Sequence, residues 1–335
     1  MSSNPTADGL VDLAALAAGR VSLGRGPDAL SVVRKHTKAF LQFVDARELH
    51  RRISAFRKLN FRSMSYSDVA QAIRDVLLFD TPNGPMAVLQ PDSAQYAAGT
   101  RFYRARTIPK DDHVTPLRSM SKVSDCWEPP SEIAPIGRLN REGEPLLYTS
   151  PLNPLVAIEE CKILNGEWCS LIVYEAVEIV KITVIGGDPE VEGLEDADAL
   201  KLEMIQGFLR DEFTRDVGQG TEYLYRISEI IAKDYFDLPP VVHHAWCYPS
   251  IVTKPAWNVA FRPRDRQKLR LIGVQIAKPR RLRESGVAFE VGLVARAREG
   301  SDDLEYFRVG SPEQRELFPE ITTRPPSVGG RPAFA

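Results

Sequence analysis

The sequence lacks the features that mark secreted, membrane-spanning or metal-binding proteins. Its 335 residues include only four cysteines, with no CxxC pair and no histidines at ligand spacing, so we expect reduced thiols that bind no metal. No apolar run reaches the roughly 18 residues of a membrane span. The N-terminal MSSNPTADGLVDLAALAAGR has no basic residue before its short apolar stretch. A cytoplasmic protein without a membrane partner is the expectation.

The common catalytic motifs are also absent. There is no P-loop, no GxSxG, no HExxH and no complete GxGxxG after a strand. His243 and His244 are adjacent in a strand-like stretch, so their side chains point to opposite faces and cannot both join one site. The formal net charge of −2 gives no reason to expect a nucleic-acid partner.

The N-terminal part of the chain has a helical pattern. Residues 28–59 carry apolar residues at intervals of three and four without internal Pro or Gly, which predicts an amphipathic helix or helix pair. This segment is locally basic, and its charges form either a solvated face or a surface for a partner. Residues 80–96 are rich in Pro, Gly, Asn and Asp, which indicates a linker and a domain boundary near residue 95.

Beyond that boundary the pattern changes to short strands interrupted irregularly by helices. The irregular order favours an α+β domain with a mixed sheet over a doubly wound parallel sheet. We therefore expect a helical region at 1–95, a catalytic domain at 96–310 and a loose Pro/Gly-rich tail at 311–335. The expected strands are 101–106, 144–148, 170–185, 241–248, 257–261, 268–276 and 289–296, and the expected helices are 153–165, 199–216 and 221–236.

Three stretches combine polar groups with an apolar, strand-like setting. In the first, RFYRAR, a strand places Arg104 and Arg106 on one face, so two guanidinium groups project together. Such groups suit phosphate, although an edge strand with solvated arginines explains the same pattern. In the third stretch, YPSIVTKPAWNVAF, Ser250 and Asn258 are either turn residues that bond their own backbone or groups that face a ligand.

The second stretch is GRLNREGEPLLYTSPLNPLVAIEECKILNG, residues 137–166. A strand ending in Tyr148 precedes Asn153 and Pro154, which suit the cap and first position of a helix. At roughly 100° per residue, Glu160 lies on the more apolar side of that helix and Glu159 on the polar side. We expect Glu160 to be the inward carboxylate, although the choice between the two acids stays open.

Taken in order, FYRAR, GRLNREGEPLLYTS, VAIEE and YPSIVTKPAWNVAF resemble the RES domain, a family named for its arginine, glutamate and serine. The family pattern runs from hxR through GRWN…G…P.(V/L)YL and (T/A)ALxE to YPS…G.N.xxF. The match covers residues 100–265, with Trp257 where the family usually has glycine. The residues that correspond to the family's functional positions are Arg104, Arg138, Tyr148, Glu160, Ser250 and Asn258.

The resemblance implies a fold similar to ADP-ribosyltransferase toxins and NAD+ as the substrate, with no metal. By the same resemblance the catalytic residues are Glu160, Arg138 and Tyr148, and the residues that bind NAD+ are Arg104, Ser250 and Asn258. The implied reaction is cleavage of the nicotinamide–ribose bond by phosphate or water, in the toxin of a toxin–antitoxin pair. Inorganic phosphate and a cognate antitoxin are then the expected partners. The alternatives are ADP-ribosyl transfer to a protein and a RES-like interaction protein without activity.

Overall fold

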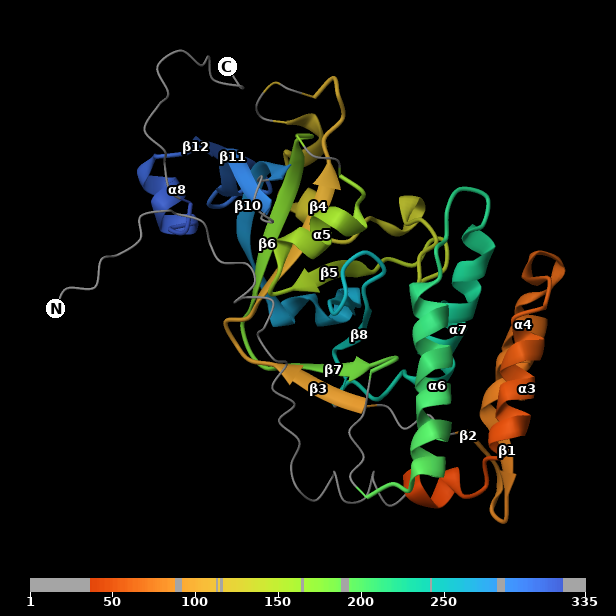
Figure 1. The fold of residues 1–335 in the computed structure, drawn as a ribbon. Coiled ribbons are helices and arrows are strands. Elements are labelled where there is room, and N and C mark those ends of the chain that lie inside the picture. The colour runs from red at the N-terminus through yellow and green to blue at the C-terminus, as the bar shows by residue number, and fades with distance from the viewer. Residues whose placement is uncertain are drawn as a thin grey trace.

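The computed structural model describes residues 37–87, 92–112, 114, 117–163, 166–187, 193–241, 243–281 and 287–321. Its main feature is a ten-stranded sheet in the order β12-β11-β10-β6-β4-β5-β9-β8-β7-β3 (Figure 1). Strands β7 and β8 pair in parallel, whereas the other neighbours in this sheet are antiparallel. The expected α+β class with a mixed sheet is therefore confirmed. The strands are β3 Asp92–Tyr96, β4 Arg101–Thr107, β5 Leu147–Pro151, β6 Cys169–Ala176, β7 Val180–Val184, β8 Ala245–Pro249, β9 Trp257–Phe261, β10 Leu269–Arg281, β11 Val287–Ala297 and β12 Leu304–Arg308.

Local sequence signals placed several of these elements well. Strand β9 has the expected bounds, and β4 extends the expected strand by one residue. The expected strand 144–148 lies further along the chain, in β5, and the expected run 170–185 divides into β6 and β7. The expected helix 153–165 ends early, as α5 Pro154–Glu160, because Lys162 turns into the left-handed region with φ of 53°.

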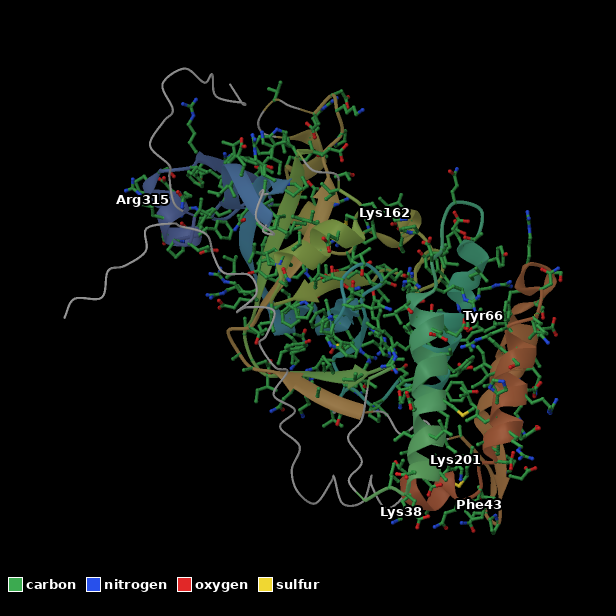
Figure 2. All side chains as sticks on the ribbon, viewed as in Figure 1. Lys38, Phe43, Tyr66, Lys162, Lys201 and Arg315 are labelled. Carbon is green, nitrogen blue, oxygen red and sulfur yellow. The ribbon has the colours of Figure 1, made fainter. Side chains whose placement is uncertain are left out.

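Helices α3 Ala46–Phe56, α4 Tyr66–Leu77, α6 Asp196–Thr214 and α7 Tyr225–Tyr235 lie side by side next to the sheet (Figure 1). Asp45 caps α3 by accepting a hydrogen bond from the Glu48 amide, and a capping box of Ser65 and Asp68 begins α4. Side chains fill the space between the N-terminal pair and the later pair, as Figure 2 shows. The shared apolar core includes Leu49, Ile53, Phe56, Ile73, Val76, Phe208, Leu209, Phe213, Ile227, Ile230, Ile231, Trp246 and Ala260.

The expected domain boundary near residue 95 is wrong. It falls inside β3, which pairs with β7 as part of the main sheet. The Pro/Gly-rich stretch before it contains the hairpin β1 Leu78–Thr81 and β2 Gly84–Ala87, in which Gly84 has a φ of 101°. The same composition suits a tight turn as well as a linker, and the helices of the N-terminal region share one core with α6 and α7. Residues 28–36 of the expected helical segment lie outside the described residues.

The expected loose tail is also wrong for its first part. Ser311 caps a short helix, α8 Pro312–Leu317, by accepting a hydrogen bond from the Gln314 amide. Phe318 follows it with no exposed surface and packs with Val173 and Val294 against the sheet. Residues 322–335 lie outside the described part of the chain. Within the described residues, no helix combines the length and apolar character needed to cross a membrane.

Candidate functional site

Glu160 is the last residue of α5, and local sequence fixes its position. The Asn153 side chain accepts a hydrogen bond from the Leu155 amide at 2.9 Å, and Pro154 occupies the first helical position. Ala157 and Ile158 are buried against the sheet together with residues of β4 and β6. The short helix is thus held on the sheet by its apolar side, and its C-terminal end carries the carboxylate.

Ser250 and Asn258 both donate hydrogen bonds to one oxygen of Glu160. Glu160 Oε1 accepts from Ser250 Oγ at 2.6 Å, from Asn258 Nδ2 at 2.7 Å and from the Ile251 amide at 3.3 Å. Among the described residues, no hydrogen bond reaches Glu160 Oε2 and no Lys or Arg nitrogen lies within 4.0 Å of the carboxylate. Three neutral donors therefore orient Glu160 and leave its charge and its second oxygen uncompensated.

The two donors are themselves fixed by the sheet. Ser250 and Asn258 are 1% and 6% exposed. Ser150 Oγ on β5 donates to Asn258 Oδ1 at 2.9 Å, which assigns the amide orientation and points Nδ2 at Glu160. Ser250 Oγ also accepts from the Thr253 amide at 3.3 Å, so the turn after β8 closes on the same hydroxyl. Ser250 thus belongs to a turn and Asn258 to a strand, and both also donate hydrogen bonds to the carboxylate of Glu160.

Glu159 has a separate partner. Thr253 Oγ1 donates to Glu159 Oε2, so the loop that follows Ser250 is held by both neighbouring acids. Of the two acids that the sequence leaves open, Glu160 is the one that lies with Ser250 and Asn258. Glu159 instead accepts a hydrogen bond from Thr253, in the loop that follows Ser250.

Arg138 is buried without a carboxylate partner. It is 9% exposed, its Nη2 donates to the carbonyl of Arg215 at 2.8 Å, and its guanidinium lies 5.4 Å from the centre of the Tyr225 ring. No Asp or Glu oxygen of the described residues lies within 4.0 Å of it. Because a buried charge is costly unless it is paired, this arrangement favours an anionic ligand.

Tyr148 is held by the loop that carries Arg138. Its hydroxyl donates to Asn140 Oδ1 at 2.7 Å and accepts from the Leu139 amide at 3.0 Å. Burial raises the pKa of Tyr148 well above its ordinary value. A Cβ on Gly137 would lie 2.5 Å from Asn140 Oδ1 and 2.9 Å from the Tyr148 hydroxyl, so only glycine fits there.

Sequence reasoning missed Asn140 as a structural residue of this site. Asn140 Nδ2 lies 2.8 to 3.0 Å from three backbone carbonyl oxygens, of Pro135, Arg141 and Glu144, which share its two hydrogens, and the residue is 3% exposed. Asn140 therefore fixes the conformation of the loop through its side chain. Its position as the last residue of the GRLN motif is the sequence signal that could have identified it.

Tyr248 is a further buried residue on this face of the sheet that sequence reasoning missed. It lies opposite Asn258 in the sheet, on the face that also carries Tyr148. Burial raises the pKa of Tyr248, the neighbouring Tyr148 and Glu160 raise it further, and Arg138 opposes the rise. Arg138 and Glu160 are therefore both within electrostatic reach of one tyrosine.

Arg104 does not join this face. Tyr103 pairs with Ser150, so Tyr103 shares the face of Ser150 and Arg104 points to the opposite one. The expected face shared by Arg104 and Arg106 exists, but their guanidinium groups donate to the carbonyls of Trp127 and Asp125. The expectation that Arg104 contacts a ligand with the other residues is thus unsupported by the geometry, because strand alternation sends it away.

Some electrostatic influence of Arg104 still reaches α5. Burial raises the pKa of the Cys161 thiol next to Glu160, and the charge of Arg104 opposes that rise. Cys161 Sγ donates to the carbonyl of Ala105 at 3.1 Å. Among the described residues, Arg104 thus acts on the end of α5 through its charge alone, and its guanidinium donates to the Trp127 carbonyl instead of Glu160.

In the described part of the chain, no group of three or more His, Cys, Asp or Glu side chains is placed to hold a metal ion. A hollow of about 510 Å³ lies elsewhere, between α3 and α4, and is lined by Glu48, Arg51, Arg52, Ala55, Phe56, Leu59, Ala72, Arg74, Asp75, Val76 and Leu78. None of these is a residue of the Glu160 site.

The chain matches no model of a protein family, and no curated protein matches it. The contacts of Glu160 and Arg138 are therefore the basis on which a function is proposed.

Proposed function

We propose that the protein is an NAD+-consuming enzyme that cleaves the nicotinamide–ribose bond, as its resemblance to the RES domain implies. The observation that supports this most is the carboxylate of Glu160, which Ser250 and Asn258 hold through one oxygen. Two residues about ninety positions further along the chain meet the acid that the resemblance singles out. A fold like that of the ADP-ribosyltransferase toxins is part of the same proposal.

Cleavage of the nicotinamide–ribose bond develops positive charge on the sugar, as in an oxocarbenium-like transition state. A fixed and uncompensated carboxylate stabilises that charge without having to reorganise. Oε2 of Glu160 is the oxygen that faces the sugar in this mechanism, while Oε1 stays bound to its three donors. Ser250 acts as an orienting group rather than a nucleophile, because its hydroxyl proton is already donated to Glu160.

Arg138 supplies the complementary positive charge. As a buried guanidinium without a counter-ion, it would neutralise the pyrophosphate of NAD+ or an incoming phosphate. Tyr148, which is hydrogen-bonded to the loop of Arg138, would supply aromatic surface for the nicotinamide or the ribose. In phosphorolysis, a phosphate oxygen bonds to the ribose carbon while the nicotinamide leaves with the electron pair of the broken bond.

The test is to incubate the full chain with NAD+, with and without phosphate, and to follow the release of nicotinamide. We expect release that phosphate accelerates if phosphate is the acceptor, release indifferent to phosphate if water is, and label transferred from NAD+ to protein if a protein is. Growth arrest on expression, relieved by a cognate antitoxin, is the expected behaviour of a toxin.

Two neighbouring variants form a matched pair. Glu160→Gln keeps the shape of the side chain and removes its charge, so we expect a loss of at least about 100-fold in turnover, as for other groups that stabilise transition-state charge. Glu159→Gln changes the adjacent residue and should retain most of the activity. Equal activity in both variants, or no NAD+ consumption by the unaltered chain, would remove this function.

A further inference from the structure

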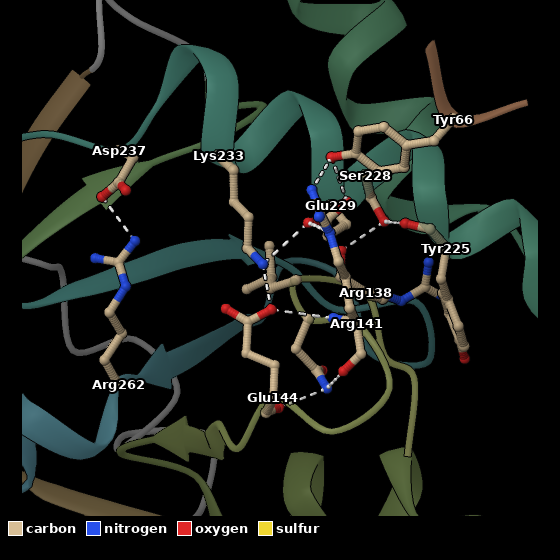
Figure 3. A network of polar contacts seen from close by, with 12 residues as sticks. Tyr66, Arg138, Arg141, Glu144, Tyr225, Ser228, Glu229, Lys233, Asp237 and Arg262 are labelled. Carbon is tan, nitrogen blue, oxygen red and sulfur yellow. Dashed lines mark hydrogen bonds and ion pairs between the residues drawn. The ribbon is translucent and has the colours of Figure 1, made fainter. Parts of the chain in front are cut away.

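Glu229 on α7 is a buried carboxylate bound by side chains from three separate segments (Figure 3). It is 2% exposed. Its Oε1 accepts a hydrogen bond from Arg141 Nε at 3.0 Å and forms an ion pair with Lys233 Nζ at 2.9 Å, and its Oε2 accepts from the Tyr66 hydroxyl at 2.9 Å. Tyr66 begins α4 in the N-terminal helical region, whereas Arg141 belongs to the loop 137–144 that carries Arg138.

The contacts between these three segments are mutual. Arg141 Nη2 donates to the Tyr66 hydroxyl at 2.5 Å, and its guanidinium lies 4.3 Å from the centre of the Tyr66 ring. Lys233 also binds Glu144, the last residue of the loop. The network thus holds the second half of the loop 137–144, at Arg141 and Glu144.

The same helix contacts Arg138 directly. Ser228 Oγ donates to the carbonyl of Arg138 at 2.7 Å, and the Tyr225 ring lies beside the guanidinium. On its other side, Arg226 donates to the carbonyls of Phe61 and Met64, which precede α4. Helix α7 therefore lies between the N-terminal helices and the loop of the candidate site, bonded to both, as Figure 3 shows for the loop side.

The chemistry of this network makes it dependent on each member. Burial raises the pKa of Tyr66 to about 12, so its hydroxyl stays protonated and donates to Glu229. Two cations and one hydroxyl satisfy a carboxylate that is out of contact with water, and loss of one partner leaves a buried charge less well compensated. The clamp formed by Tyr66, Arg141, Glu229 and Lys233 thus joins a buried carboxylate to cations that are partly solvated, since the Arg141 side chain is 59% exposed and that of Glu229 only 2%.

We propose that Tyr66 and Glu229 are positioning residues, through which the N-terminal helical region fixes the loop 137–144 and with it Arg138. In this proposal the N-terminal helices, which lie outside the RES resemblance, help to position a residue of the candidate site. The consequence for substrate binding rests on the proposed function, whereas the fixing of the loop does not.

Hydrogen exchange at the amides of residues 137–144 tests the clamp in the full chain. Tyr66→Phe removes the hydroxyl and keeps the ring in the core, and Glu229→Gln removes the charge. We expect exchange in the loop to become about tenfold faster in Tyr66→Phe, because a hydrogen bond to a charged group changes a local opening equilibrium by about that factor. Glu229→Gln should have a larger effect.

The control is Arg57→Gln. Arg57, the C-cap residue of α3, pairs with Asp211 on α6, and both side chains are about half exposed. This variant removes a different contact between the N-terminal helices and the later pair, so loop exchange should stay unchanged. Loop exchange in Tyr66→Phe equal to that of the unaltered chain, or faster exchange spread evenly over the sheet, would overturn the proposal.

Kinetics then separate positioning from general destabilisation. If Arg138 binds the phosphates of NAD+, Tyr66→Phe should raise the KM for NAD+ several-fold and leave kcat nearly unchanged. A fall in kcat with KM unchanged would count against this role. If the unaltered chain consumes no NAD+, the proposed function fails, and the exchange experiment decides the clamp on its own.

Discussion

Replacing Asn258 by aspartate would place a second carboxylate against Glu160 with almost no change in shape. The amide of Asn258 now donates to Glu160 Oε1 at 2.7 Å. Asn258→Asp exchanges this donor for an acceptor in a site that is largely out of contact with water. The prediction is a large loss of stability at neutral pH that disappears in acid.

The magnitude follows from two independent estimates. Two unit charges about 4 Å apart repel each other by about 4 kcal/mol at an effective dielectric constant of about 20. Alternatively, the introduced carboxyl group takes up a proton. At pH 7, which is about three units above the ordinary carboxyl pKa of about 4, this protonation costs about 4 kcal/mol. The two routes agree, so the unfolding free energy should fall by about 3 to 4 kcal/mol at pH 7.

The sign of the pH dependence is fixed by the same reasoning. Repulsion raises the pKa of the introduced carboxyl in the folded state above its value in the unfolded chain. The folded variant therefore binds more protons, and its deficit relative to the unaltered protein shrinks as the pH falls from 7 toward about 4. Near pH 4 only the cost of an altered hydrogen bond should remain, about 1 kcal/mol.

Chemical unfolding at pH 7 and at pH 4.5 measures this difference. Ser250→Ala is the matched control, because it removes a neutral donor from the same oxygen of Glu160. It should cost about 1 kcal/mol at both pH values. If Asn258→Asp were as stable as the unaltered protein at pH 7, or if its deficit did not depend on pH, the carboxylate would not be held as described.

Three further changes have definite expected outcomes. Gly137→Ala should cost about 1 to 3 kcal/mol of unfolding free energy, since its Cβ meets the Asn140 and Tyr148 side chains, and an unaltered transition midpoint would contradict this. Phe318→Ala should cost about 3 to 5 kcal/mol and make the chain after residue 311 sensitive to proteolysis, whereas a truly loose tail would show neither effect. Burial lowers the pKa of His243 to about 4, so the unfolded chain binds a proton that the folded one does not, and stability should fall by about 3 kcal/mol from about pH 6.5 to 4. In chemical unfolding measured across that pH range, the unfolding free energy of His243→Gln should not show this decrease.

Capping residues and strand-forming residues in the sequence correctly predicted several helices and strands. Asn153 and Pro154 begin α5 as their capping preferences require, and WNVAF forms a strand with the expected bounds. The meeting of Glu160 with Ser250 is different, because ninety residues separate them. No propensity or periodicity encodes that contact, and only the order of four motifs suggested it.

The face on which Arg104 lies could not be predicted from its own strand. Alternation shows that Arg104 and Arg106 share a face, but the register with β5 decides which face that is. The domain boundary failed for a related reason. Pro, Gly and Asn mark a tight hairpin and a linker equally well, and only the pairing of β3 with β7 distinguishes them.

The two carboxylates at the centre of these proposals differ in how their charge is balanced. Glu229 contacts two cations, Arg141 and Lys233, so its negative charge is neutralised within the protein. Among the described residues, Glu160 accepts from a hydroxyl, an amide and a backbone N–H, which orient it and leave its charge in place. Arg138 has the opposite excess: its buried guanidinium donates to the Arg215 carbonyl and lies beside the Tyr225 ring, with no carboxylate partner in the described part of the chain.

A ligand that complements both must bring positive charge to Glu160 and negative charge to Arg138. NAD+ carries both, in the cationic nicotinamide–ribose end and the pyrophosphate. Because an unpaired buried charge reduces stability, the burial of Arg138 without a carboxylate partner among the described residues favours an anionic ligand. By the same criterion Glu229 is structural, and its effect on NAD+ should come only through the position of Arg138.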